Sequence, residues 1–266
     1  MKATGMVLCR TVMTAAVAAA FLILRPALAS ASCQVVGVVK AANDSVLPGE
    51  PIELTFTIRN ATAQPVSLFK PSELTGNVRL SIANSSGPDV RRDYRGPGWG
   101  IRDAVGAPVL LSPNGELTIP LRILYHSVVL SVNPDRTKEI MTAFAISQPG
   151  TFLLKPRYSD HTACPRSAPA EAVATVQVVA PTGKDLAVWN AIKECKQCAY
   201  FLHTGREQDN QASHDAVTLL RNLVKQYPSS RYAKLIRSQL DALDSKSRGD
   251  HNDDGHPDQG KPPASN

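Results

Sequence analysis

The stretch PIELTFTIRN, residues 51–60, carries the clearest structural signal in the chain. Apolar and polar residues alternate through it, so that Ile52, Leu54, Phe56 and Ile58 share one face. Successive side chains of an extended chain point to opposite faces, and strict alternation therefore predicts a β-strand buried on one side. We expect a sheet with one face on an apolar core and the other in water.

The same period of two recurs through the first two thirds of the chain. Alternating apolar residues occur in 78–82, 117–123 and 140–146, and the turn-forming stretches LPGE, SSGPD, SPNGE and SQPGT separate the runs. Pro120 interrupts one run, which predicts an edge strand or a bulge because proline has no N–H to donate. Several short strands without a helical pattern between them predict an antiparallel β-sandwich over residues 30–181.

Beyond this region the spacing of apolar residues changes to three or four. The first stripe consists of Val188, Ile192, Cys195, Ala199 and Leu202, which this spacing places on one face of a single helix. Thr182 can cap the N-terminus of that helix, with Asp185 in its first turn.

Two further helices are expected downstream. Their stripes are Ala216, Leu220, Leu223 and Tyr227, and then Tyr232, Ile236, Leu240 and Leu243. We expect about three amphipathic helices in residues 182–245, packed together or against the sandwich. Residues 246–266 have almost no apolar side chains, which predicts a disordered polar tail.

The N-terminus has the features of a secretory signal peptide. Lys2 and Arg10 precede an apolar run over residues 11–24, and Ala-Leu-Ala at 27–29 provides the small residues that signal peptidase requires. We expect residues 1–29 to be removed and the mature protein to be exported, to the periplasm or the medium. The apolar run is shorter than the roughly 20 residues that span a bilayer, so we expect no transmembrane segment in the mature chain.

Charge and length restrict the class of protein. Loss of the signal removes Lys2, Arg10 and Arg25, which lowers the formal charge from +6 to +3. This small excess does not favour nucleic-acid binding. About 235 mature residues suffice for one large domain or two small ones. Only 5% of the residues are aromatic, so we expect aliphatic cores.

The chain has five cysteines, of which Cys9 lies in the signal peptide. Four remain, an even number that favours disulfides in an oxidising compartment. We expect Cys33 to pair with Cys164, which would tie the start of the first strand to a late loop. We expect Cys195 to pair with Cys198.

The stretch KECKQCAYFL, residues 193–202, poses the question of whether its cysteine pair is a reactive centre or a structural bridge. Reactive pairs sit at a helix N-terminus, where the helix dipole lowers the thiol pKa. The apolar stripe places Cys195 about a dozen residues into a helix, and we therefore favour a structural disulfide. A zinc site is an alternative, in which the other two cysteines or His203 would complete the ligands.

The C-terminal stretch DHNDDGHPD matches the opening of a calcium-binding loop. Its candidate ligands are Asp250, Asn252, Asp254 and Asp258. The position where such a loop needs a bidentate glutamate has Lys261. We therefore favour a solvated acidic tail over calcium binding, and we expect no other cofactor.

The stretch RRDYRGPGWGIRD combines cationic and aromatic residues. These are Arg91, Arg92, Tyr94, Arg95, Trp99 and Arg102. A loop of this composition on a rigid sandwich can bind an anionic glycan or a protein. In the alternative, which we favour slightly, Trp99 folds back onto the sheet edge.

Two sets of motifs resemble known families. LPGEPIELTFTIRNATAQPVSL and QPGTFLLKPRY resemble turn-and-strand segments of the immunoglobulin-like or fibronectin-like sandwiches of bacterial exported proteins. LLRNLVKQYPSSRYAKLIRSQL is similar to adjoining helices of tetratricopeptide-type repeats in envelope proteins. The resemblance implies an immunoglobulin-like sandwich with a helical appendage, and it assigns no catalytic residues.

Common catalytic signatures do not occur in the sequence: Gly-x-Ser-x-Gly, His-Glu-x-x-His and a phosphate-binding glycine-rich loop are missing. We therefore expect a non-catalytic exported protein that serves as a protein-interaction or envelope-structural module, with another envelope or secreted protein as partner. The alternatives are a thiol-disulfide or metal-binding protein that uses Cys195 and Cys198, and a carbohydrate-binding module that uses Tyr94 and Trp99.

Overall fold

The structure is a computed structural model that describes residues 34–72, 76–85, 92–96, 108–132, 138–159 and 169–249. It is mainly β, with four helices in the last part of the described chain. The predicted strand at residues 51–60 is confirmed as β3 (Ile52–Asn60), and its side chains alternate between buried and more exposed positions.

The first sheet has the antiparallel order β1-β3-β8, with β1 at Val35–Ala41 and β8 at Glu116–Ile123. Within the described chain β8 pairs only with β3, so Pro120 lies on an edge strand as predicted. The register aligns Thr57 with Val38 on one side and with Thr118 on the other.

The second sheet has the order β2-β13-β11-β5-β6. Its strands are β2 (Ser45–Val46), β13 (Ala174–Val178), β11 (Gly150–Tyr158), β5 (Val78–Asn84) and β6 (Arg92–Tyr94), and β12 (Ala170–Glu171) pairs with β11. The β2 and β13 pair is parallel, which differs from the purely antiparallel arrangement expected. Two small sheets are formed by β4 (Val66–Phe69) with β7 (Pro108–Leu111), and by β9 (Tyr125–Val132) with β10 (Lys138–Phe144).

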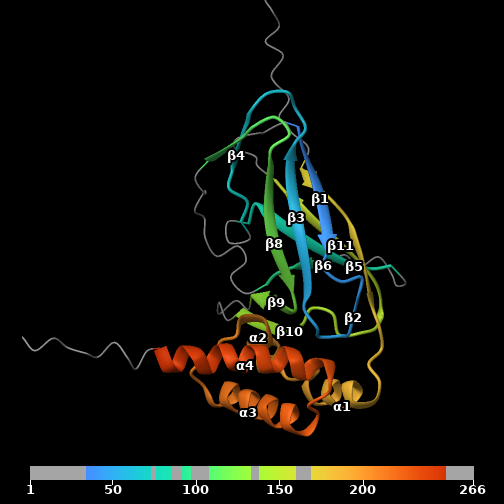
Figure 1. Ribbon diagram of the computed structural model, residues 1–266, viewed down its shortest axis with the longest axis vertical. Helices are drawn as coiled ribbons and strands as arrows, with labels where there is room; N and C mark the ends of the chain where they lie inside the picture. The colour runs from blue at the N-terminus through green and yellow to red at the C-terminus, as the bar shows by residue number, and fades with distance from the viewer. Residues whose placement is uncertain are drawn as a thin grey trace, which may run out of the picture. The chain divides into compact units, whose positions relative to one another are not determined.

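The two larger sheets lie in two layers, with β1, β3 and β8 in front of β5, β6 and β11 in Figure 1. One apolar core fills the space between them. Its largest fully buried side chains include Phe56 and Leu54 from β3, Tyr158 and Leu154 from β11, and Leu80 from β5. Most side chains of this core are aliphatic, as expected from the composition.

The helical part contains four helices where about three were expected. They are α1 (Gly183–Ile192), α2 (Lys196–Thr204), α3 (Gln211–Gln226) and α4 (Arg231–Gly249). The single first helix of the prediction was wrong, because the backbone leaves the helical conformation at Cys195, with φ −84° and ψ 94°. At the other end, α4 continues to Gly249, four residues beyond the predicted end of the helical region at Ser245.

The helices and one end of the β part share a second core. The β part contributes Leu47, Leu124, Tyr125 and Phe144 to the buried cluster that the helices build. In Figure 1, α2 lies beside β9 and β10. The helices therefore do not form a separate core of their own.

The turn of residues 47–50, which has the sequence LPGE, is the main polar attachment point of the helices. The hydroxyl of the buried Tyr232 donates to the carbonyl oxygen of Pro48 at 2.7 Å. Arg231 binds both carboxylate oxygens of Glu50, with Nε at 3.1 Å from Oε1 and Nη2 at 2.6 Å from Oε2. Burial, followed by the charges of Glu50 and Asp185, raises the pKa of Tyr232 above its ordinary range, so this hydroxyl stays protonated and donates.

Asp185 lies in the first turn of α1 as predicted, and its carboxylate also binds the start of α4. Thr182 is the N-cap of α1, but its side chain makes no capping hydrogen bond. The carboxylate of Asp185 instead accepts from the Ser230 hydroxyl at 2.7 Å and from the Arg231 backbone N–H at 2.8 Å. It thereby satisfies a donor at the start of α4, where the helix dipole favours negative charge.

No helix in the described parts of the chain is both long enough and apolar enough to cross a membrane.

Candidate functional site

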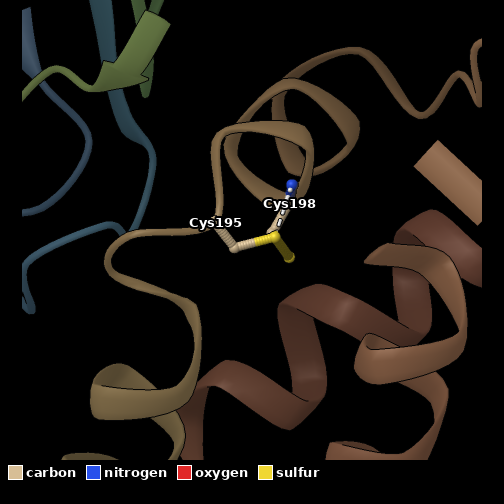
Figure 2. Close-up of a disulfide and its surroundings, with 2 residues drawn as sticks. All are labelled: Cys195 and Cys198. Atoms are coloured by element: carbon tan, nitrogen blue, oxygen red, sulfur yellow. Dashed lines mark hydrogen bonds between the residues drawn. A yellow bond between two sulfur atoms is a disulfide. The ribbon is translucent and has the colours of Figure 1, made fainter. Parts of the chain in front are cut away.

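Cys195 and Cys198 form a disulfide at the N-terminus of α2 (Figure 2). Cys195 is the N-cap residue, and its Sγ accepts the backbone N–H of Cys198 at 3.1 Å. The predicted pairing of these two cysteines is therefore confirmed. The argument that placed Cys195 deep inside a helix was wrong, since α1 ends at Ile192 and a new helix begins after Cys195.

The two sulfur-bearing residues differ in their surroundings. Cys198 is completely buried and belongs to the helical core, whereas Cys195 is only partly buried. The chain on either side of Cys195 is exposed and charged, with Lys193, Glu194 and Lys196. Cys195 therefore lies at the edge of the helical core and Cys198 lies inside it.

The location of the disulfide at the N-terminus of α2 affects the reactivity of the two thiols that its reduction would form. A helix N-terminus presents partial positive charge and unpaired N–H groups, which stabilise a thiolate at the N-cap. Burial in an apolar core has the opposite effect and favours the protonated thiol. From the sequence we argued against a reactive pair, because Cys195 would lie too far inside a helix for the helix dipole to act on it. This reasoning does not hold in this fold.

A second candidate surface is the outer face of the β1-β3-β8 sheet. Its two middle rows across β1, β3 and β8 are Val38, Thr57 and Thr118, and Lys40, Thr55 and Pro120, and Val36 lies in the end row beside Arg59. Val38 is 56% exposed and Val36 is 38% exposed, although both are apolar. The hydroxyls of Thr57 and Thr118 lie 3.3 Å apart and share a hydrogen bond across the strands.

Charged residues border this face at both ends of the strands. At one end Arg59 lies opposite Glu116 and donates to the Asn114 side chain at 3.0 Å. At the other end Arg122 forms an ion pair with Glu53 at 3.1 Å. A surface that combines an exposed apolar side chain with hydroxyl-bearing residues and charges can serve as a protein-binding surface, since such interfaces mix apolar and polar groups.

Tyr94 is not on the surface, where the carbohydrate-binding alternative would need it. Tyr94 is 2% exposed, and its hydroxyl donates to the Arg122 carbonyl oxygen at 3.2 Å. Its ring stacks on His126, with ring centroids 5.7 Å apart. The ring therefore has no free face for a sugar. Arg95 is exposed, and its backbone N–H donates to His126 Nδ1 at 3.1 Å.

Several predicted site residues lie outside the described residues. These are Arg91, Trp99 and Arg102 of the loop, the cysteines Cys33 and Cys164, and the candidate calcium ligands Asp250, Asn252, Asp254 and Asp258. For Arg92 the structure describes the backbone, in β6, and not the side chain. The predictions about them stay predictions.

His203 forms part of the contact between α2 and the β part. Its Nδ1 accepts the backbone N–H of Tyr125 at 3.4 Å, and the Arg122 guanidinium donates to the neighbouring Leu202 carbonyl oxygen at 3.2 Å. Burial, and secondly the positive charge of Arg122, lower the pKa of His203 from 6.5 to about 4. His203 is therefore neutral at pH 7, as an acceptor must be.

Asn60 is a structural residue that the sequence pattern did not reveal. Its side chain is fully buried, and its amide nitrogen lies within 3.1 Å of the carbonyl oxygens of Gln64, Leu111 and Ser112. Its Oδ1 accepts from the N–H and hydroxyl of Thr62. The Asn-Ala-Thr sequence is the only local sign of this role, because two of the acceptors lie far away in the chain.

Among the residues whose positions are described, no group of three His, Cys, Asp or Glu side chains is placed to hold a metal ion. Metal binding through Cys195 and Cys198 would also require the thiolate forms, which the disulfide does not provide.

No protein-family model matches the chain, and no curated protein sequence does. Solved structures give distant similarities. A β-glucosidase from Erythrobacter marinus has a TM-score of 0.29 at 12% identity, over 54% of this chain and 15% of its own. The alkylpurine DNA glycosylase AlkC from Pseudomonas fluorescens has a TM-score of 0.29 at 13% identity, over 55% of this chain and 30% of its own.

A third similar structure is the CARDB domain of the PF1109 protein from Pyrococcus furiosus, with a TM-score of 0.27 at 11% identity, over 55% of this chain and 88% of its own. The chain spans less than a third of the length of the glucosidase and the DNA glycosylase. At these TM-scores the similarities assign neither a fold family nor a function.

Proposed function

We propose that this chain is an exported, non-catalytic interaction module, built on an immunoglobulin-like sandwich, that binds another envelope or secreted protein. The observation that carries the proposal is the outer face of the β1-β3-β8 sheet, with the exposed Val38, Lys40 and threonines in its middle rows and charged pairs at both ends. The signal sequence of residues 1–29 supports export.

The side chains on this face suit contact with a protein. Val38 and Thr57 are β-branched, so they have few rotamers and lose little entropy when a partner orders them. The Glu53 and Arg122 ion pair stands at the border, where charges affect the choice and orientation of a partner more than its affinity.

The remainder of the molecule holds this face in a fixed shape. Inner residues of the same strands, such as Phe56 and Ile58, are fully buried in the core between the sheets. Arg122 connects the border of the face to α2 through the Leu202 carbonyl oxygen. A surface on a rigid scaffold binds with less loss of entropy than a flexible loop.

Site-specific photo-crosslinking tests the proposal. A photoreactive residue is placed at Thr57, and in a second variant at the exposed Lys234 on α4. We expect a discrete adduct with one protein of the envelope or medium from position 57 and none from position 234.

Two surface substitutions then locate the contact. Val38→Glu places a charge at the centre of the face and should remove the adduct. Leu110→Glu is the matched control, because Leu110 is 71% exposed but lies on β7. Loss of the adduct in both variants, or no adduct at position 57 in the unsubstituted background, contradicts the proposal.

A further inference from the structure

We propose that the Cys195–Cys198 disulfide is a thiol-disulfide exchange site, in which Cys195 is the sulfur that partner thiols attack and Cys198 is the leaving group, which in the reverse direction resolves the mixed disulfide on Cys195. The inference goes beyond the proposed interaction function and does not rest on it. The observations that carry it are the existing bond, the unequal burial of the two cysteines and the N-cap position of Cys195.

The exchange requires a partner of the dithiol class. One partner thiolate attacks Sγ of Cys195, the Cys195–Cys198 bond breaks, and Cys198 leaves with the electron pair and takes up a proton. The second partner thiolate then attacks the partner sulfur of this mixed disulfide and releases Cys195. The partner dithiol is oxidised by two electrons to a disulfide, and the protein pair is reduced by the same two electrons.

The geometry selects Cys195 for the attack. Cys195 is half-buried at the edge of the helical core, so an incoming thiolate can reach it more readily than Cys198, which is completely buried among apolar side chains. The exposed Lys193 and Lys196 add positive charge near the approach, and the exposed Glu194 opposes it in part. In the reduced form, the N-terminus of α2 and the Cys198 N–H stabilise the thiolate of Cys195.

Removal of the resolving cysteine should trap the intermediate. The mature full-length Cys198→Ala variant is incubated with oxidised glutathione, and the adduct is measured by intact mass and located by peptide mapping. We expect stoichiometric glutathionylation of Cys195, at a rate at least about tenfold higher than that of Cys198 in a Cys195→Ser variant. The pH dependence of alkylation should give a thiol pKa for Cys195 below the free value of about 8.5.

The two substitutions preserve the fold for separate reasons. Serine is a preferred N-cap residue and can replace the Cys195 acceptor, and alanine keeps the Cys198 position apolar. Circular dichroism and thermal melting check each variant. Equal reaction rates of the two variants, or a Cys195 thiol that titrates at 8.5 or above, would overturn the proposal and leave a purely structural disulfide. A third contrary result is a wild-type disulfide that millimolar glutathione opens only on unfolding.

Discussion

At the scale of single residues, Gly49 shows why the LPGE turn has its sequence. Its φ is +73°, in the left-handed region that favours glycine, and a Cβ on Gly49 would lie 2.4 Å from Cζ3 of Trp189. Trp189 stacks in turn on Tyr232, whose hydroxyl binds the same turn. The turn therefore needs glycine both for its backbone conformation and for the close approach of a helix.

Alanine substitutions at two glycines separate these effects. Gly76 has a similar φ of +71°, but nothing lies within 4 Å of the position of its Cβ. We expect Gly76→Ala to cost about 1 kcal/mol of unfolding free energy for the backbone conformation alone. Gly49→Ala should cost about 1–3 kcal/mol more because of the contact with Trp189. Urea denaturation measures both, and equal losses would show that the turn can move away from Trp189.

At the scale of elements, polar bonds fix the helices to the β part at two places. The first is the LPGE turn, which holds Arg231 and Tyr232 of α4. The second is the start of β9, where Tyr125 and the adjacent Arg122 bind residues at the end of α2. Both contacts involve backbone groups of the β part, so they specify where each helix lies along the strands.

The Tyr232 hydroxyl provides a test of the first contact. Tyr232→Phe leaves the Pro48 carbonyl oxygen buried without this donor, and we expect a loss of about 1–3 kcal/mol in unfolding free energy. Tyr227→Phe is the control, since Tyr227 lies at the end of α3, partly buried, and should change stability by less than about 0.5 kcal/mol. Similar small changes in both variants would mean that water replaces the donor.

The second contact should make stability depend on pH. The pKa of His203 is about 4 in the folded protein and 6.5 in an ordinary setting, so between these values the unfolded chain binds more protons. The contribution of His203 to stability is complete above pH 6.5 and is lost as the pH falls towards 4. We expect His203→Asn, which keeps an acceptor near Nδ1, to lose less stability than the wild type between pH 7 and pH 4.5.

Denaturation of both proteins at the two pH values measures this difference. Carboxylates titrate in both proteins to the same extent, so the comparison between wild type and variant isolates His203. If both proteins lost the same unfolding free energy between the two pH values, His203 would take up a proton in the folded state as readily as in the unfolded chain.

At the scale of the whole molecule, the β part and the helices depend on one another. Leu47, Leu124, Tyr125 and Phe144 belong to the β part in sequence and to the helical core in space. The rings of Phe144 and Trp189 meet edge to face, with centroids 5.2 Å apart. Burial of apolar area across this boundary links the unfolding of the two parts.

We therefore expect a fragment of residues 34–181 to be less stable than the full mature chain and to bind a hydrophobic dye, because it exposes those four side chains. In a Trp99→Phe variant, whose remaining Trp189 lies in α1, the full chain should unfold in one transition when followed by tryptophan fluorescence and by circular dichroism. Two separate transitions, or a fragment with an unchanged denaturation midpoint, would show independent domains.

The sequence by itself determined much of the local structure in the described part of the chain. The alternation in residues 51–60 fixes which face of β3 is buried, since side chains of a strand alternate whatever lies nearby. The stripes in residues 211–245 likewise define the inner faces of α3 and α4. The pairing of Cys195 with Cys198 also follows from short spacing along the chain.

Only the tertiary structure decided where these elements meet. The spacing of Val188, Ile192 and Cys195 is compatible with one helix. In the structure α1 ends at Ile192 and a second helix begins after Cys195, a break that the apolar pattern does not reveal. Tyr94 looks like an exposed ligand-binding residue in sequence, yet strands distant in the chain cover it. Periodicity records local geometry, whereas burial arises from residues far apart in sequence. The apolar spacing also did not reveal that α2 begins after Cys195, so the chemistry of Cys195 became visible only in the fold.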